Sequence, residues 1–155
     1  MVYKVYLSYE KAVEDFISEL STLLLTHHVD GIVHLLGVGI SRQPEGDASV
    51  PQRCVLMLQY AGTPLNEYLS TGPPGGPLSH RNRGAVEPAA LLYYILPAVV
   101  QLLRTQHHLQ NSMGRLGIEA GNIDIKPENV CMDLESKHGE HVFLKATLID
   151  VEGIM

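Results

Sequence analysis

Apolar residues recur along the chain with the spacing of helices in two long stretches. Over residues 10–26 they return every three or four positions, which predicts a helix with one apolar face. The repeating positions are Ala12, Val13, Phe16, Ile17, Leu20, Leu23 and Leu24. Over residues 87–109 the apolar positions cover more than one face, so we expect this longest helix to lie at the centre of a lobe. Pro97 should kink or split it, because proline cannot donate the helical hydrogen bond.

Runs rich in β-branched and aromatic residues predict the strands. These runs occupy residues 2–7, 33–40, 53–60, 130–134 and 141–149. The last two form a predicted hairpin after a proline-containing loop, and a short helix is expected over residues 64–70. Residues 41–51 and 71–86 carry glycine and proline turn chemistry, and the second stretch should be a mobile surface loop. The elements together predict an α+β fold with a small antiparallel sheet.

Composition narrows the kind of protein. The 155 residues suffice for one domain with a core, and 45% apolar against 18% charged residues is typical of globular chains. A formal charge of −6 without a Lys/Arg run argues against a nucleic-acid surface. No apolar run approaches the roughly 20 residues that span a bilayer, and no signal peptide is evident. Cys54 and Cys131 lie in strand-like runs, so we expect reduced core thiols and a cytoplasmic or nuclear location.

The densest group of chemically useful residues lies in Asp124-Ile-Lys-Pro-Glu-Asn129, followed later by Asp150 at the end of an apolar run. Pro127 has no N–H to donate, so this is a shaped loop and not a helix interior or a central strand. For any one of these residues a solvated turn is the commoner explanation. The ordered set favours phosphoryl transfer, in which one carboxylate orients a hydroxyl and a lysine neutralises the moving phosphoryl group. The amide and the second carboxylate are suitable ligands for magnesium.

This stretch resembles the catalytic loop of the eukaryotic protein kinase family, in its Ser/Thr form because Lys126 lies two residues after Asp124. Asp150 falls where the family's Asp-Phe-Gly motif begins. The resemblance implies that Asp124 accepts or orients the substrate hydroxyl and that Lys126 stabilises the γ-phosphoryl group. It also implies that Asn129 and Asp150 hold Mg²⁺, with ATP as the phosphoryl donor.

The resemblance extends to the first half of the chain. Lys4, in the centre of the first predicted strand, would be the family's ATP lysine, and Glu19 has the register of its αC-helix partner. Alternatives remain open at each position. Lys4 can be an edge-strand lysine that deters aggregation, Glu14 can be its partner, and Glu19 can be a solvated helix residue.

The segment after the third predicted strand resembles the family's hinge. Leu58 would be the gatekeeper, and Gln59, Tyr60 and Ala61 would meet adenine through backbone groups. By this resemblance the chain is a partial kinase domain. Its parts are an N-lobe remnant over 1–60, hinge and short helix over 61–70, a flexible loop over 71–86, and the start of the C-lobe, including the αE helix, over 87–155.

Several positions depart from the family's pattern. No Gly-rich loop precedes the Lys4 strand, and Asn122 and Ile123 stand where the family has His and Arg. Val151 and Glu152 replace the Phe and Gly of Asp-Phe-Gly, and no activation segment follows. We therefore expect little or no kinase activity from these 155 residues. A pseudokinase-like module that binds a protein partner, and a small-molecule phosphotransferase of kinase-like fold, remain as alternatives.

Overall fold

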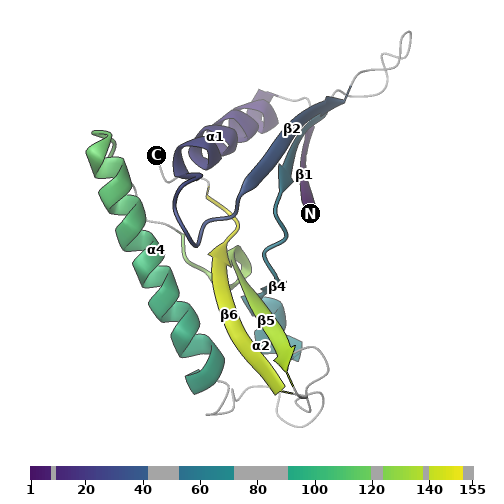
Figure 1. Ribbon diagram of the computed structural model, residues 1–155. Coiled ribbons are helices and arrows are strands. Elements are labelled where there is room, and N and C mark those ends of the chain that lie inside the picture. Colours follow the sequence, from purple (N-terminus) through teal and green to yellow (C-terminus); the bar gives the residue numbers. More distant parts are fainter. Residues whose placement is uncertain (8–9, 42–52, 72–90, 120–123, 138–139, 152–155) are drawn as a thin grey trace.

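The computed structural model describes residues 1–7, 10–41, 53–71, 91–119, 124–137 and 140–151. Within these residues the chain forms two three-stranded antiparallel sheets and three α-helices (Figure 1). The α+β class expected from the alternation of strand-like and helix-like runs is confirmed. The predicted loops over 41–51 and 71–86 lie almost wholly outside the described residues.

The first sheet has the strand order β1-β3-β2 and contains β1 (Val2–Leu7), β2 (Leu35–Ser41) and β3 (Arg53–Leu58). All three strands were predicted, although β2 begins and β3 ends two residues away from the expected limits. Side chains alternate between the faces of a strand, so Lys4 and Tyr6 share a face. They lie opposite Leu56 and Cys54 of β3, respectively. Among the described strands, β1 is at the edge of this sheet.

The helix α1 (Glu10–Thr26) has the predicted limits and packs its buried side against this shared face. The buried side differs from the predicted apolar stripe. Val13, Ile17 and Leu24 are exposed. The residues buried instead are Ala12, Phe16, Glu19, Thr22, Leu23 and Thr26. The buried threonine hydroxyls donate to backbone carbonyls one turn back, Thr22 to Ser18 at 3.0 Å and Thr26 to Thr22 at 2.8 Å. These hydrogen bonds offset the loss of hydration on burial.

The second sheet has the order β4-β5-β6 and contains β4 (Thr63–Pro64), β5 (Val130–Lys137) and β6 (Glu140–Leu148). The helix α2 (Leu65–Thr71) follows β4 directly. The hairpin was predicted, but β5 is longer than the expected 130–134. Its pairing with β6 continues past a register shift at Asp133/Leu134 to Lys137↔Glu140.

The longest helix is split at its beginning. A π-helical turn, η2 (Leu91–Ile95), passes into α4 (Leu96–Arg115), and Pro97 lies in the first turn of α4. Proline is tolerated there because the first helical N–H groups have no partner inside the helix. Where a kink or split was expected at Pro97, the helix changes from π-helical to α-helical geometry, and the helical run continues without a gap.

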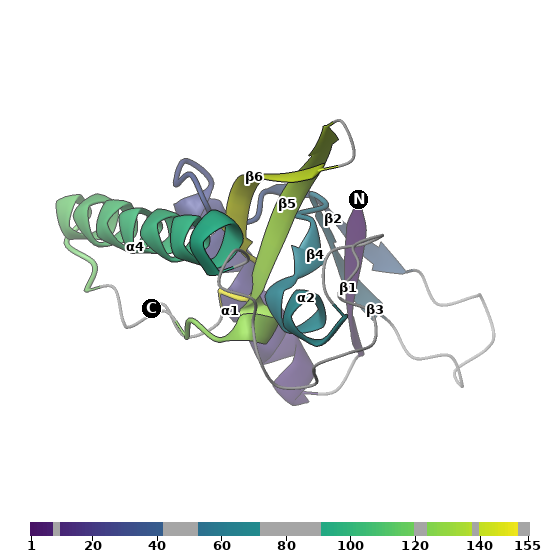
Figure 2. The same ribbon diagram turned by 90° about the horizontal axis from the view of Figure 1, so that it is seen from below.

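The predicted end of the longest helix at residue 109 is wrong, because α4 continues to Arg115. Met113 is fully buried and extends the inner stripe that includes Leu102 and Leu109. The helix ends where Gly117 takes a positive φ of 71° and the Ile118 N–H donates to the Met113 carbonyl at 3.0 Å. α4 lies beside β6, and its C-terminal end extends beyond the sheets (Figure 2).

The turn over residues 30–33 joins the two sheets. Ile32 forms a parallel bridge with Leu148, the last residue of β6. The Val33 N–H donates to the Leu148 carbonyl at 2.9 Å, and the Leu148 N–H donates to the Gly31 carbonyl at 2.8 Å. The hydrophobic core includes residues of both sheets, of α1 and of α4, so the described parts pack as one body.

Both cysteines are free thiols, as expected, one on each sheet. Burial raises the pKa of the Cys131 thiol to about 11. Within the described ranges, no helix has the length and apolar character needed to cross a membrane.

Candidate functional site

Lys4 and Glu19 form the centre of the candidate site. The Lys4 ammonium Nζ lies 2.5 Å from Glu19 Oε2. The Glu19 side chain has no exposed surface, whereas the Lys4 side chain is 34% exposed. The strand β1 directs Lys4 toward α1, and the helix register turns Glu19 toward the sheet. A buried carboxylate is stabilised by such a paired cation, because the charge would otherwise lose its hydration without compensation.

Tyr6 is a member of this group that the sequence analysis missed. Its hydroxyl donates a hydrogen bond to Glu19 Oε2, the oxygen that also faces Lys4. Lys4 Nζ lies 5.6 Å from the centre of the Tyr6 ring, and that ring packs edge-on against Phe16 at 5.5 Å. The available signal was the strand alternation, because Tyr6 lies two residues after Lys4 and so points to the same face.

Asp150 reaches the same place from the other end of the chain. Its Oδ1 lies 3.7 Å from Lys4 Nζ, and its side chain is 37% exposed. Two backbone links hold it there. The bridge between Ile32 and Leu148 fixes the end of β6 against the turn that precedes β2, and the Ile149 N–H donates to the Asn129 carbonyl at 2.9 Å.

The loop residues form a second group. Asp124 Oδ2 lies 3.1 Å from Lys126 Nζ, and Glu128 Oε1 lies 3.8 Å from the same atom. The hydrogen bond and charge of Asp124 raise the pKa of Lys126 above its usual value, and the carboxylates of Glu128 and Asp150 act in the same direction. Lys126 therefore stays protonated at neutral pH, and Asp150 is near enough to contribute to the rise in the pKa of Lys126.

Asn129 connects the loop to the hairpin. It ends the 3₁₀ turn η3 (Pro127–Asn129), is buried, and donates from Nδ2 to the Asp124 carbonyl at 3.2 Å. Its amide oxygen Oδ1 is the remaining acceptor. Since the next residue, Val130, pairs with Leu148, Asn129 and Asp150 lie at the same end of the hairpin. The structure thus forms two neighbouring groups of predicted residues. One group is Lys4 with Glu19, and the other is the loop that contains Asp124, Lys126 and Asn129. Asp150 lies near both groups.

The side-chain oxygens of Asn129 and Asp150 suit a magnesium ion that phosphate oxygens also coordinate. Within the part of the chain that the structure describes, no group of three His, Cys, Asp or Glu side chains could hold a metal alone. Asn129 and Asp150 supply one amide and one carboxylate. Mg²⁺ in nucleotide sites commonly takes one or two carboxylates, with water and substrate phosphates completing its six ligands.

The predicted hinge residues lie between the two sheets. Leu58 is buried at the end of β3, Tyr60 is exposed, and Ala61 is half-buried. The Gln59 N–H donates to the His34 carbonyl at 2.9 Å, so this donor is already used within the fold. Recognition of adenine by this segment would have to use the Gln59 carbonyl and the backbone of the next two residues.

Gln59, Tyr60 and Ala61 also line a hollow of about 60 Å³ that includes Asp133 and Lys145. Small-molecule pockets usually have about 300–1,000 Å³, so this hollow is too small for a purine.

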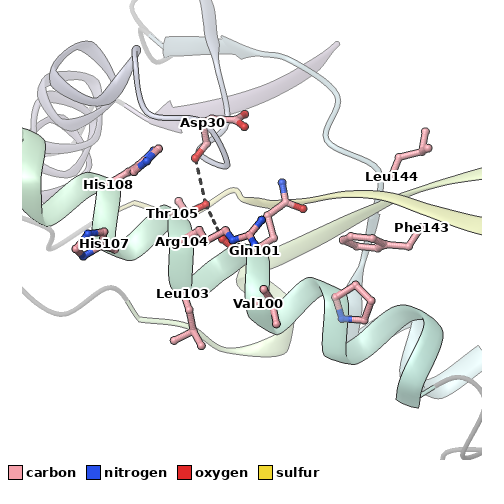
Figure 3. A pocket seen from close by; sticks show the side chains of 11 residues that line it. Asp30, Val100, Gln101, Leu103, Arg104, Thr105, His107, His108, Phe143 and Leu144 are labelled. Atoms are coloured by element: carbon pink, nitrogen blue, oxygen red, sulfur yellow. Dashed lines mark hydrogen bonds between the residues drawn. The ribbon is translucent and has the colours of Figure 1, made fainter.

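A larger hollow, of about 800 Å³, lies elsewhere, between α4, the turn at Asp30 and β6 (Figure 3). No predicted site residue lines it. Figure 3 shows Thr105 between Asp30 and Gln101; its hydroxyl lies 3.1 Å from each of their carbonyl oxygens. The basic side chains at this hollow, Arg104, His107 and His108, are exposed, so water weakens any attraction they exert on an anion.

The departures from the kinase pattern can be placed only in part. Asn122, Ile123 and Glu152 lie outside the described residues, while Val151 is fully buried in the core beside the site. No protein-family model matches the chain. A search among curated proteins likewise finds no match.

Proposed function

We propose that the chain is a segment of a Ser/Thr protein kinase domain that binds Mg-ATP and has little or no transferase activity by itself. One observation carries the proposal. Two carboxylates from distant parts of the chain lie close to the Lys4 ammonium of strand β1. Glu19 of helix α1 lies 2.5 Å from it, and Asp150, after the last strand, lies 3.7 Å from it. A lysine between two carboxylates of different burial is suited to binding nucleotide phosphates beside a metal ion.

The two carboxylates have different roles in this proposal. Glu19 has no exposed surface and serves as the fixed counter-charge that holds Lys4 in place. Asp150 is partly exposed and lies at the end of the hairpin with Asn129, so these two residues would hold Mg²⁺. When bound, the metal ion would neutralise charge on the phosphates.

The loop residues would act on the substrate hydroxyl. The Asp124 side chain is 66% exposed, so a hydroxyl group of a protein substrate can approach it. A positioned carboxylate of this kind contributes roughly 10²–10⁴-fold to such reactions. Lys126, 3.1 Å from Asp124 and protonated at neutral pH, would stabilise the γ-phosphoryl group.

The test is nucleotide binding, which does not require turnover. We expect titration calorimetry with Mg-ATP to show binding, and Lys4→Ala to weaken it at least tenfold, because hydrogen bonds to charged groups contribute about 1.5–3 kcal/mol. Lys137→Ala is the matched control, since Lys137 is also a strand lysine in an ion pair, 2.8 Å from Glu135, but lies far along the hairpin. Equal affinity of Lys4→Ala and the wild type, or no binding by the wild type at millimolar Mg-ATP, would contradict the proposal.

A non-catalytic interaction module is the second candidate function. The observation that favours it is the outward face of the first sheet, where Tyr3, Val5 and Leu7 are exposed on the edge strand β1. Exposed strand edges with apolar side chains commonly pair with another chain. Absence of Mg-ATP binding together with capture of an extended peptide at β1 would favour this function over the first.

A further inference from the structure

We propose that Tyr6 is a positioning residue that holds Glu19, and through it Lys4, in the arrangement that binds nucleotide phosphates. This inference rests on the proposed function. It concerns a residue for which the kinase resemblance gave no role, and it begins from the hydrogen bond between the Tyr6 hydroxyl and Glu19.

The buried carboxylate of Glu19 needs polar partners from the protein. Glu19 has no exposed surface, so it keeps its charge only if protein groups replace the water it has lost. Its Oε2 receives both the Lys4 ammonium and the Tyr6 hydroxyl. The hydroxyl is a neutral donor that adds a hydrogen bond to this oxygen without adding a second positive charge.

Burial and a ring contact hold Tyr6 in place. It is buried on β1, and its ring packs edge-on against Phe16 of α1 at 5.5 Å between centres. Lys4 lies 5.6 Å from the centre of the same ring, within the range of a cation–π contact. Tyr6 thus contacts the helix, the carboxylate and the ammonium together, and a rigid ring limits the rotamers available to both charged partners.

Glu19 and Asp150 compete for the Lys4 ammonium. Asp150 Oδ1 is only 3.7 Å from the ammonium and carries the same charge as Glu19. If Glu19 loses the Tyr6 hydrogen bond, its carboxylate is less fixed and Asp150 can draw Lys4 toward itself. This shift would remove the lysine from the phosphates and would also occupy the carboxylate expected to hold Mg²⁺.

The experiment is a double-mutant cycle read by Mg-ATP binding. Tyr6→Phe keeps the ring and removes only the hydroxyl, and we expect affinity to fall about tenfold, as for loss of a hydrogen bond to a charged group. Tyr3→Phe is the matched control on the exposed side of the same strand, and it should leave affinity unchanged. In the Glu19→Gln background, Tyr6→Phe should cause no further loss, because Tyr6 acts through the Glu19 charge. Circular dichroism melts establish that each variant is folded.

Each result decides the matter. Binding by Tyr6→Phe equal to wild type overturns the inference while leaving the proposed function in place. Losses from Tyr6→Phe and Glu19→Gln that multiply also overturn it, because they assign Tyr6 a packing role independent of Glu19. Failure of the wild type to bind Mg-ATP overturns the proposed function and this inference together.

Discussion

Polar side chains occupy places on the inner side of α1 where aliphatic residues would be expected. Glu19, Thr22 and Thr26 are buried there, and Val13 and Ile17 of the same helix are exposed. Each of these three side chains has a partner, Glu19 through its Oε2, which lowers the usual penalty for burial. The face that α1 turns to the sheet is therefore determined by where Glu19 meets Lys4 and Tyr6, as well as by hydrophobicity.

A pH dependence follows from the buried Cys131 thiol. Its pKa is raised from 9.0 to about 11 in the folded protein, so the native state holds the proton more tightly than the unfolded chain. The resulting stability is fully present below pH 9 and is lost as the pH rises to 11, a change of about 2–3 kcal/mol. We expect urea unfolding at pH 8 to 11 to show a steeper decline for the wild type than for Cys131→Ala. Parallel declines would contradict this assignment.

The proximity of single residues of the candidate site was predictable where a motif and a period agreed. Lys4, Glu19 and Asp150 were selected by their order and register, and the structure brings them together. Two features depend on segments that are distant in sequence. The Gln59 N–H donates to the His34 carbonyl, which no local pattern of the predicted hinge segment reveals. Tyr6 could be placed on the Lys4 face, but its bond to Glu19 requires the packing of α1 on β1.

At the scale of elements, period and turn chemistry predicted the helices and strands but not all of their ends. The predicted helix over 87–109 stops before the polar run Gln110-Asn111-Ser112, yet α4 continues through that run. Met113 is a single apolar residue after that run, too little for a pattern, and its complete burial is visible only once α4 packs on the core. Tertiary packing overrides weak local preference in such segments.

The turn that joins the sheets depends on Gly31. Its φ is +91°, a region that L-residues with a side chain avoid, and a Cβ there would collide with Thr105 Oγ1 on α4. We expect Gly31→Ala to lower the free energy of unfolding by about 3 kcal/mol or more, from strain and overpacking together, as measured by urea denaturation.

Gly114→Ala provides the control for this substitution. Gly114 lies near the end of α4, and a Cβ there would meet no other atom within 4 Å. Alanine should stabilise this exposed helical position by about 0.5–1 kcal/mol. Similar changes in stability for the two glycines would show that the turn at Gly31 is looser than its geometry indicates.

At the scale of the whole molecule, the two sheets share one core. Leu56 and Leu58 of the first sheet belong to the same buried cluster as Met132 and Leu148 of the second. The bridge between Ile32 and Leu148 adds main-chain hydrogen bonds across the junction. We therefore expect the sheets to lose their structure in a single transition.

The position of the cysteines allows a direct test of this expectation. Cys54 is on β3 of the first sheet and Cys131 on β5 of the second. Brief alkylation at increasing urea, followed by mass spectrometry, should give the same midpoint for both thiols. A lower midpoint for Cys54 would mean that the first sheet opens separately and that the shared core does not couple the two.

The contact between Lys4 and Asp150 closes a loop that takes in almost the entire polypeptide. Closing so long a loop has an entropic cost, so contacts of this kind form late during folding, after local ones. The β5–β6 hairpin and α4 are built from neighbouring residues and can form early. An intermediate that contains them still lacks the contact between Lys4 and Asp150. If the proposed function holds, Mg-ATP binding should therefore report the completion of folding more faithfully than helical content does.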